Sequence, residues 1–444
     1  MLLCRLLIIL PPWVSLAPPP VAAASPLFSD TLFSDTPFTV VWNMPTARCH
    51  SRHGVHLPLP SLGILANRQQ SFQGQTVSLF YKNRLGLYPY LSRDGRRVHG
   101  GVPQRADLKA HLSRATAQLS SLLRPGFRGL AVLDWEAWRP LWARDFGSKM
   151  AYRQLSKNLV RRSHPELSQQ EVTWLARKEF ERGARKLMWE TLRLGVSLQP
   201  GGLWGYYGFP SCFNDPPTTG PEPRLGGNHT HVYTGQCHPR TRRRNDQLAW
   251  LWAQSTALYP SIYLPRRVAG SPDAALMVRH RLLEASRVAS QHGSATRPPP
   301  VLPYARLAFV HTLTFLNQTD LEHTLGESAA LGAAGVVLWG EIKFARSKHQ
   351  CELLRDYLGS VLGRYIQTLR NDVILCSHRR CHGNGRCARR DPLSDHMIPS
   401  TTSDPTLTPD PSHNLSDVYD HFLCQCYQGW TGDTCQMKTA SNTS

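Results

Sequence analysis

The sequence is poor in acidic residues. Of its 444 residues, 31 are Asp or Glu against 51 Lys or Arg, and the formal net charge is +20. An excess of this size favours a polyanionic partner, which can be nucleic acid, an acidic glycan or an anionic membrane. The chain also lacks helix-turn-helix, zinc-finger and RNA-binding signatures, so we expect no nucleic-acid partner.

Long apolar runs are absent after the first residues. None approaches the length that crosses a bilayer, so we expect no transmembrane segment. The first residues, MLLCRLLIILPPWVSLAPPPVAAAS, contain a short apolar run with Arg5 and reach a small-residue stretch at Ala22–Ala24. We interpret residues 1–24 as a signal peptide. The last residues, QMKTASNTS, carry no hydrophobic tail of the kind that directs a lipid anchor.

Cysteine usage indicates the same secretory route. There are 11 cysteines, and Cys4 lies in the predicted signal peptide. The remaining ten form an even number, as expected of a disulfide-bonded secretory protein. We therefore expect a secreted or lysosomal protein. Asn-x-Ser/Thr triplets, each a weak signal alone, are compatible with that route and occur at Asn228, Asn317, Asn414 and Asn442.

Several catalytic and metal-binding patterns are missing. The stretch Gly326–Ala330 resembles a nucleophile elbow but has Ala where the second Gly belongs, which argues against a serine hydrolase. His229, His231 and His238 lie in a Gly/Pro-rich stretch, where histidines usually face solvent. The Cys-x-Cys pattern near the C-terminus is not a zinc pattern. We expect no metal and no cofactor.

The densest basic run is Arg240-Thr241-Arg242-Arg243-Arg244. We interpret it as a solvated loop before a helix. Contact with a polyanion and a processing-protease site are the alternatives.

Strand-like apolar runs alternate with longer amphipathic stretches between residues 38 and 340. A capping-box pattern at Ser168–Glu171 opens the clearest helix. This alternation predicts an α/β fold with a parallel sheet, and the number of runs favours a closed, TIM-type (β/α) barrel over residues 25–372. The predicted strands cover residues 38–43, 77–81, 129–136, 202–207, 259–263, 301–309 and 335–339.

The composition changes after residue 372. Three cysteines at 376, 381 and 387 precede a Ser/Thr/Pro-rich insert over 396–414, and the closing C-x-C-x8-C pattern contains Gly429, Trp430 and Gly432. That spacing is typical of an EGF-like module, and a segment this small needs disulfides for stability. We predict an EGF-like domain over 373–437 and a tail over 438–444.

The third predicted strand ends in two carboxylates, Asp134 and Glu136. Because side chains alternate along a strand, both point to one face while Trp135 points to the other. Two carboxylates held together raise at least one pKa, which suits a general acid. A helix N-cap or a solvated strand end explains the same residues without catalysis. The other strand ends carry Asn43, Tyr81, Tyr207, Tyr263 and Trp339, which suit a sugar-binding cleft.

Long segments of the chain resemble the vertebrate hyaluronidases of glycoside hydrolase family 56. The blocks FYKNRLGLYPY and CSHRRCHGNGRCARRDP (376–392) are closest to one somatic subtype of that family. The resemblance covers nearly all of the predicted mature chain. It rests on VVWNMP (40–45), HGVHLPL (53–59), FYKNRLGLYPY (80–90), AVLDWEAWRPLW (131–142), GLWGYYGFP (202–210), NDQLAWLW (245–252), ALYPSIYLP (257–265), SAALGAAGVVLWG (328–340) and the cysteine-rich tail.

The resemblance implies a distorted barrel with fewer than eight regular strands and an EGF-like module. It also implies an endo-acting, retaining hydrolase that cleaves the β-1,4 bond after N-acetylglucosamine in hyaluronan by substrate-assisted catalysis. Glu136 then corresponds to the acid/base, and Asp134 to the carboxylate that orients the acetamido group. The corresponding substrate-contacting residues are Tyr81, Arg139, Tyr207, Tyr263, Arg281 and Trp339.

The family pairing implies disulfides Cys49–Cys351, Cys212–Cys237, Cys376–Cys387, Cys381–Cys424 and Cys426–Cys435. Ser211 and Phe213 depart from the Asp and Tyr of many members, which would weaken positioning at the cleft rim. We expect a monomer that acts on hyaluronan, with chondroitin sulfate as a related substrate. The alternative is a weakly active or inactive glycan-binding protein of the same fold.

Overall fold

A computed structural model describes residues 33, 35–216, 233–292, 298–400 and 418–439. The predicted signal peptide, the histidines at 229 and 231 and three of the sequons (Asn228, Asn414 and Asn442) lie outside these ranges. The fourth, Asn317, is exposed and caps a short helix.

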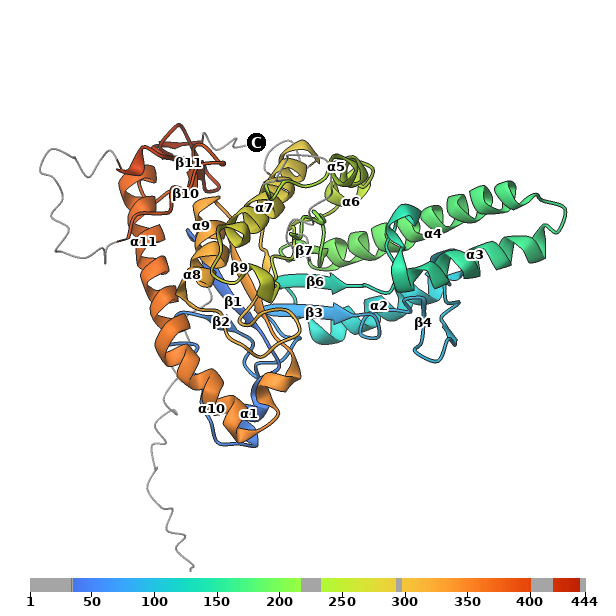
Figure 1. Ribbon diagram of the computed structural model, residues 1–444, viewed down its shortest axis with the longest axis horizontal. Coiled ribbons are helices and arrows are strands. Elements are labelled where there is room, and N and C mark those ends of the chain that lie inside the picture. Colours follow the sequence, from blue (N-terminus) through green and yellow to red (C-terminus); the bar gives the residue numbers. More distant parts are fainter. Residues whose placement is uncertain (1–32, 34, 217–232, 293–297, 401–417, 440–444) are drawn as a thin grey trace, which may run out of the picture.

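The centre of the molecule is a ring of short parallel strands (Figure 1). Strand β1 pairs with β2 on one side and with β9 on the other, and β9 pairs with β8. A second group has the order β3-β6-β7. The strands span β1 Thr39–Asn43, β2 Leu65–Ala66, β3 Val77–Tyr81, β6 Leu130–Asp134, β7 Leu203–Tyr206, β8 Tyr304–Arg306 and β9 Gly335–Trp339.

Irregular backbone and one side chain close the ring. The run at 259–263, predicted as a strand, forms only isolated bridges, from Tyr259 to Tyr207 and from Ser261 to Tyr304. Pro260 within it has no N–H to donate to a ladder. Between β2 and β3, the side chain of Asn67 donates to the carbonyl of Val77 at 2.7 Å and accepts from its N–H at 3.2 Å. The architecture is the distorted (β/α) barrel that the resemblance implied.

Helices follow the strands and cover the barrel. Helices α3 and α4 lie side by side and extend away from it as a long hairpin (Figure 1). Ser168 caps α4 in a capping box with Glu171, as predicted. The helices span α1 Ala47–Ser51, α2 Leu108–Leu122, α3 Met150–Ser163, α4 Gln169–Leu198, α5 Pro239–Asp246, α6 Ala249–Trp252, α7 Pro272–His292, α8 Gln318–Leu321, α9 Glu327–Ala330, α10 Lys348–Tyr357 and α11 Gly363–Cys381.

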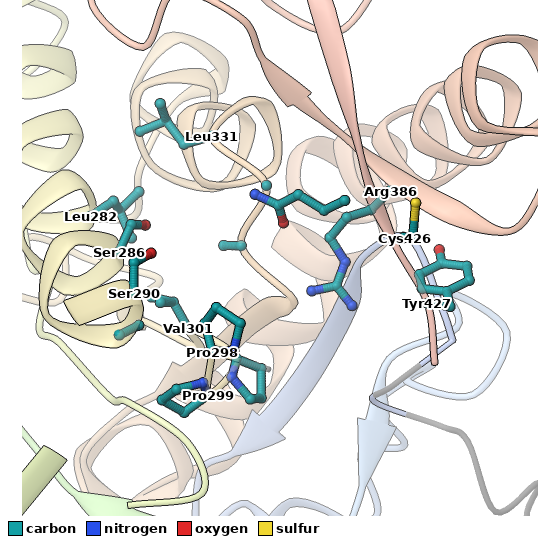
Figure 2. A pocket seen from close by; sticks show the side chains of 15 residues that line it. Leu282, Ser286, Ser290, Pro298, Pro299, Val301, Leu331, Arg386, Cys426 and Tyr427 are labelled. Carbon is teal, nitrogen blue, oxygen red and sulfur yellow. The ribbon is translucent and has the colours of Figure 1, made fainter. Parts of the chain in front are cut away.

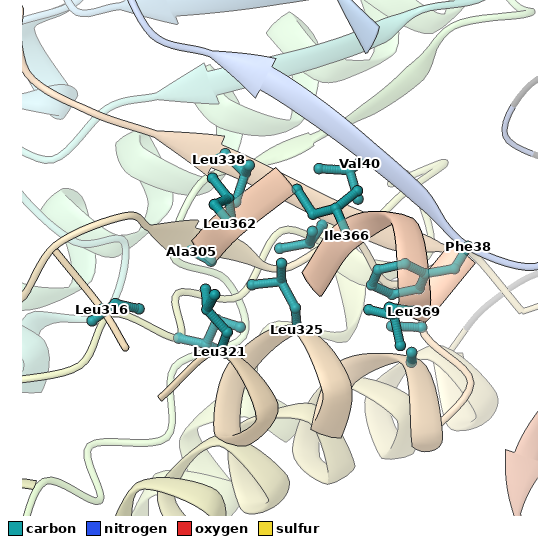
Figure 3. Packing of buried hydrophobic residues seen from close by; sticks show 14 of the residues in the cluster. Phe38, Val40, Ala305, Leu316, Leu321, Leu325, Leu338, Leu362, Ile366 and Leu369 are labelled. Atoms are coloured by element: carbon teal, nitrogen blue, oxygen red, sulfur yellow. The ribbon is translucent and has the colours of Figure 1, made fainter. Parts of the chain in front are cut away.

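Outward-facing strand residues form the core between barrel and helices. Val40 of β1 and Leu338 of β9 pack against Leu362 and Ile366 (Figure 3). Leu362 ends the π-helical segment Leu358–Leu362 between α10 and α11, and Ile366 lies in α11. Leu325, in the π-helical segment Glu322–Gly326, lies in the same cluster. Inward-facing residues of these strands are thereby left free to line the barrel.

The C-terminal module begins on a helix that belongs to the barrel. Helix α11 continues through the predicted boundary at 372/373 to Cys381, and the boundary stays a prediction. Beyond it, β10 (Gly385–Arg389) pairs with β11 (Phe422–Cys426) and β12 (Trp430–Thr431) with β13 (Met437–Lys438), both antiparallel. A separate hairpin joins β4 (Tyr90–Leu91) to β5 (Arg97–Val98).

The disulfides are those that the family pairing implied. Three lie in or beside the module, one closes the loop before α5, and one joins α1 to α10 across most of the chain. The pairs are Cys376–Cys387, Cys381–Cys424, Cys426–Cys435, Cys212–Cys237 and Cys49–Cys351.

Candidate active site

The inward-facing side chains at the carboxyl ends of the strands are polar or aromatic. Asn43, the last residue of β1, donates from its Nδ2 to the hydroxyl of Tyr304 at 2.9 Å. Trp339, the last residue of β9, donates from its indole Nε1 to the hydroxyl of Tyr81 at 3.1 Å. In a parallel barrel these ends meet at one face, where active sites form.

Asp134 ends β6 at this face and is buried. Its Oδ1 has no hydrogen-bond partner among the described residues. Burial is the main cause that raises the pKa of Asp134, the charge of Glu136 adds to it, and Arg139 opposes it. A carboxyl in this setting keeps its proton to a higher pH than usual, or accepts a hydrogen bond when ionised.

Glu136 lies just beyond the strand end and faces solvent with about half of its side chain (51%). Nη2 of Arg139 approaches its Oε1 at 3.3 Å, while Nη1 of the same guanidinium is buried without a partner. Nζ of Lys149 donates to the carbonyl oxygen of Glu136. The exposed carboxyl can reach a substrate, while Arg139 contacts the carboxyl and Lys149 anchors the backbone of the same residue.

Aromatic rings form a wall beside the carboxylates. Tyr263 stacks on Trp339 with ring centroids 5.9 Å apart, and Tyr207 lies 6.1 Å from Tyr263. The hydroxyl of Tyr207 donates to Ser261 Oγ at 3.4 Å. Burial, and next the charge of Glu136, raises the pKa of Tyr207 to about 12, so its phenol stays protonated. Flat faces with hydroxyl tips suit a sugar ring and its amide substituent.

A buried carboxyl supports the loop that carries Arg139. Asp145 has no exposed surface, and its Oδ1 accepts from the backbone N–H of Arg139 at 2.7 Å. Burial raises the pKa of Asp145 to about 7 against the opposing effects of the Arg139 N–H, Lys149 and Arg153. The sequence analysis missed this residue, and nothing in its local pattern distinguishes it from a solvated Asp.

Arg281 has a different setting from Arg139. Its Nε donates to Asn214 Oδ1 at 2.8 Å, its Nη1 to the carbonyl of Ser261 at 3.1 Å, and its Nη2 lies 3.3 Å from Asp215. Burial lowers its pKa, which these partners oppose. Arg281 therefore ties the start of the Cys212–Cys237 loop to the strand end at Ser261, which is a positioning role.

Two further residues at the site escaped the sequence analysis. Tyr304 and Arg306 are two apart on β8 and so point into the barrel together. Arg306 is buried, lies over the rings of Trp339 and Tyr263 at 5.2 and 5.8 Å, and pairs with Glu341 at 3.2 Å. The period-2 spacing within the run 301–309 could have identified both.

A cavity of about 410 Å³ lies elsewhere (Figure 2). Ser286 and Ser290 of α7 line one side, Pro299 the floor, and Arg386 and Tyr427 of the C-terminal module the other side. The segments preceding β8 and β9 border it, so it lies at the amino ends of the strands. It is separate from the carboxylate site.

Comparison with known proteins identifies the family. The family model described as Hyaluronidase, glycoside hydrolase family 56, matches residues 28–439. The chain belongs to the hyaluronidase family. Human Hyaluronidase-3 is 48% identical over 90% of this chain and 91% of its own length. Human Hyaluronidase-1 is 41% identical over 93% and 95%.

A solved hyaluronidase structure shares the fold. Bee venom hyaluronidase, crystallised with a hyaluronic acid tetramer, superposes with a TM-score of 0.66 at 31% identity. The superposed region covers 75% of this chain and 99% of the bee venom chain. The somatic subtype that the blocks at 80–90 and 376–392 indicated is Hyaluronidase-3, and the matches to Hyaluronidase-3 from human and pig agree with it.

Among the described residues, no cluster of three or more His, Cys, Asp or Glu side chains is arranged to hold a metal ion. Within the same residues, no helix combines the length and the apolarity that spanning a bilayer requires.

Proposed function

We propose that this protein hydrolyses hyaluronan at the β-1,4 bond after N-acetylglucosamine, as an endo-acting, retaining glycosidase. Membership of the hyaluronidase family supports the reaction. The observation that carries the site is the pair at the end of β6, in which a buried Asp134 with a raised pKa lies beside an exposed Glu136.

In the first step the acetamido oxygen of the substrate attacks C1 while Glu136 donates its proton to the leaving oxygen. The C1–O bond breaks, and a cyclic oxazolinium forms within the sugar. Asp134 accepts the acetamido N–H, which aligns the oxygen for attack and offsets the positive charge that develops. Tyr207 and Tyr263 hold the amide from the other side.

In the second step Glu136, now ionised, removes a proton from water. The resulting hydroxide attacks C1 on the face that the leaving group vacated. The oxazolinium ring opens, and the configuration at C1 is retained overall. Nη2 of Arg139, 3.3 Å from Oε1 of Glu136, helps to orient the carboxylate toward the water. Its unpartnered Nη1 is suited to a glucuronate carboxylate.

The protein acts as a monomer in the secretory pathway, in the extracellular space or the lysosome. The disulfides support an oxidising compartment. Chondroitin sulfate, which also carries a β-linked N-acetylhexosamine and a uronate, is a second substrate to compare.

Glu136→Gln tests the assignment. Gln keeps the shape of the side chain but cannot donate the proton. The rate of cleavage should therefore fall by about 10²–10⁴-fold, while the affinity for hyaluronan stays close to wild type. The measurement is hyaluronan chain length after incubation at acid and neutral pH, with chondroitin sulfate run in parallel. Glu166→Gln, an exposed Glu (64%) before α4, is the matched control and should cleave normally. Wild-type rates for Glu136→Gln would refute the acid/base role.

A further inference from the structure

The basic run at 240–244 forms helix α5, not the solvated loop that the sequence suggested. Pro239 occupies the first turn and His238 caps it by accepting from the N–H of Arg240 at 3.1 Å. Thr241 and Asn245 are buried and anchor the helix to the body of the protein. With this face inward, residues spaced by three and four on the opposite side share one outer face.

Arg240 and Arg243, which are exposed, and Arg244, which is half-buried, make up that outer face. Among the described residues these three form no ion pair, whereas Arg242 turns the other way and lies 3.6 Å from the buried Glu284. Asp246, the acidic residue that ends the helix, pairs with Arg287 at 2.8 Å. Three positive charges therefore lie together, and no acidic side chain in the described part of the chain forms an ion pair with them.

These charges connect to the candidate active site. Arg144 is buried beneath them and donates to the carbonyl of Thr241 at 3.5 Å. Burial lowers the pKa of Arg144 to about 10, and repulsion by Arg244 and by Arg139 adds to this effect. Arg139 in turn lies 3.3 Å from Glu136. A basic path thus runs from the catalytic carboxylate through Arg144 to α5.

Exposed aromatic rings accompany the path. Phe213, 48% exposed, lies over the guanidinium of Arg144 at 4.4 Å. Phe146, 56% exposed, meets Phe213 edge to face with centroids 6.2 Å apart. Leaving two large apolar rings in water is unfavourable, and an apolar sugar face is a suitable cover for them.

We propose that Phe146, Phe213 and the α5 arginines Arg240, Arg243 and Arg244 form a subsite for the polyanionic sugar chain beyond the unit that is cleaved. The rings receive a sugar face, and the guanidinium groups bind uronate carboxylates. The ligand's identity rests on the proposed function. The site acts by holding a long chain, so its effect must grow with chain length.

The experiment changes Arg240, Arg243 and Arg244 together to Ala and measures binding of polymeric hyaluronan to the full-length chain carrying Glu136→Gln. Apparent Kd should rise about five- to fifty-fold at low salt, because three charge contacts of about 0.3–0.8 kcal/mol each are lost. Changing the same three to Lys keeps the charges and should preserve most of the affinity. Arg355→Ala, Arg364→Ala and Arg379→Ala, all exposed on α10 and α11, remove the same charge and should change Kd by less than about twofold.

A second readout in active protein compares substrates. On polymer, kcat/KM should fall several-fold more than on the shortest oligosaccharide that the wild type cleaves. Unchanged polymer affinity in the Ala variant would overturn the subsite. So would an equal loss on short and long substrates, because that shows an effect on the catalytic loop. If the wild type cleaves neither substrate, the proposed function fails, while the binding comparison still decides the subsite.

Discussion

At the scale of single residues, the sequence predicted that Asp134 and Glu136 lie together but not how each is solvated. Strand alternation placed Asp134 and Glu136 on one face of β6. The strand ends at Asp134, so one carboxyl is buried and the other extends into solvent. That difference decides which group titrates unusually, and it depends on distant packing that no local pattern shows.

Arg139 and Arg281 were indistinguishable in the sequence, because both match family arginines near the cleft. In the structure Arg139 keeps a donor without a partner, whereas the donors of Arg281 are occupied by Asn214, Ser261 and Asp215. Ser328, in the near match to a nucleophile elbow, is fully buried and donates to the carbonyl of Thr324 at 2.7 Å. This burial agrees with rejecting a serine hydrolase.

Asp145 provides a prediction at this scale. The folded protein keeps the proton on Asp145 up to about pH 7, whereas an unfolded Asp releases it near pH 3.9. Because the folded state binds more protons between these values, rising pH removes stability across roughly pH 4–7, by at most about 4 kcal/mol. Asp145→Asn keeps an acceptor for the Arg139 N–H but cannot ionise.

The variant should therefore gain stability relative to wild type as pH rises from acid to neutral. Thermal unfolding of both proteins at two pH values measures this, and the difference in Tm between them should increase with pH. Asp94→Asn, at an exposed Asp on a hairpin, is the control. A difference in Tm that is the same at both pH values would show that Asp145 does not titrate between them.

At the scale of elements, regular periodicity predicted well and irregular backbone did not. Strands β1, β3, β6 and β9 fall within the predicted runs, and α4 begins at its capping box. The run at 259–263 failed as a strand because Pro260 interrupts the ladder. Strand β2 was missed because only two residues pair and Asn67 completes the closure through its side chain.

Helix α5 was predicted as a loop because consecutive arginines carry no apolar period. Its stability comes from Pro239, the His238 cap and the burial of Thr241 and Asn245, which only the fold reveals. Asn245 Nδ2 donates to the carbonyl of Ser211 at 2.9 Å and to Glu284 at 2.7 Å. The tertiary contacts of two small polar residues outweigh the composition of the run.

A buried ion network joins three elements and yields the second prediction. Glu327 of α9 accepts from Arg279 of α7 at 2.6 Å and from both Nη atoms of Arg389 of β10 at 2.9 Å. All three side chains are at most 3% exposed. Removing the acid leaves the buried Arg389 without its charge partner and leaves Arg279 with only the exposed Asp395 at 2.7 Å, which costs about 3–5 kcal/mol.

Glu327→Gln should therefore unfold at a clearly lower temperature or denaturant concentration than wild type. Glu352→Gln is the matched control, because its pair with Lys348 is long (3.9 Å) and exposed (36% and 68%), and its loss should cost less than about 0.5 kcal/mol. Equal stability of the two variants would mean that the network contributes nothing to holding the C-terminal module on the barrel.

At the scale of the whole molecule, the sequence predicted a barrel followed by a module, and the structure shows how they are joined. Helix α11 is shared by both, and the Glu327 network links α9 of the barrel to β10 of the module. Within the barrel, the Cys49–Cys351 disulfide joins α1 to α10 across 302 residues of sequence. Long-range closure of this kind has no local sequence pattern. The family resemblance, and not spacing, supplied the pairing.

The charge of the molecule provides the last prediction. Residues 146–198, which include the α3–α4 hairpin, contain 11 Lys or Arg against 5 Glu, and α5 adds the arginines described above. Hyaluronan carries one carboxylate in every disaccharide, so many weak contacts with exposed cations add to its binding. The Debye screening length shortens from about 30 Å at 0.01 M to about 8 Å at physiological ionic strength, so each charge contact weakens as salt rises.

The affinity of the Glu136→Gln protein for polymeric hyaluronan should therefore fall steadily as salt rises, which equilibrium binding across a salt series measures. Carboxyl-reduced hyaluronan, which keeps the sugar faces but has no charge, should bind with little salt dependence. If native hyaluronan showed the same flat response, stacking on Tyr263, Trp339 and their neighbours would have to supply the affinity, and the excess of positive charge would have no role in substrate capture.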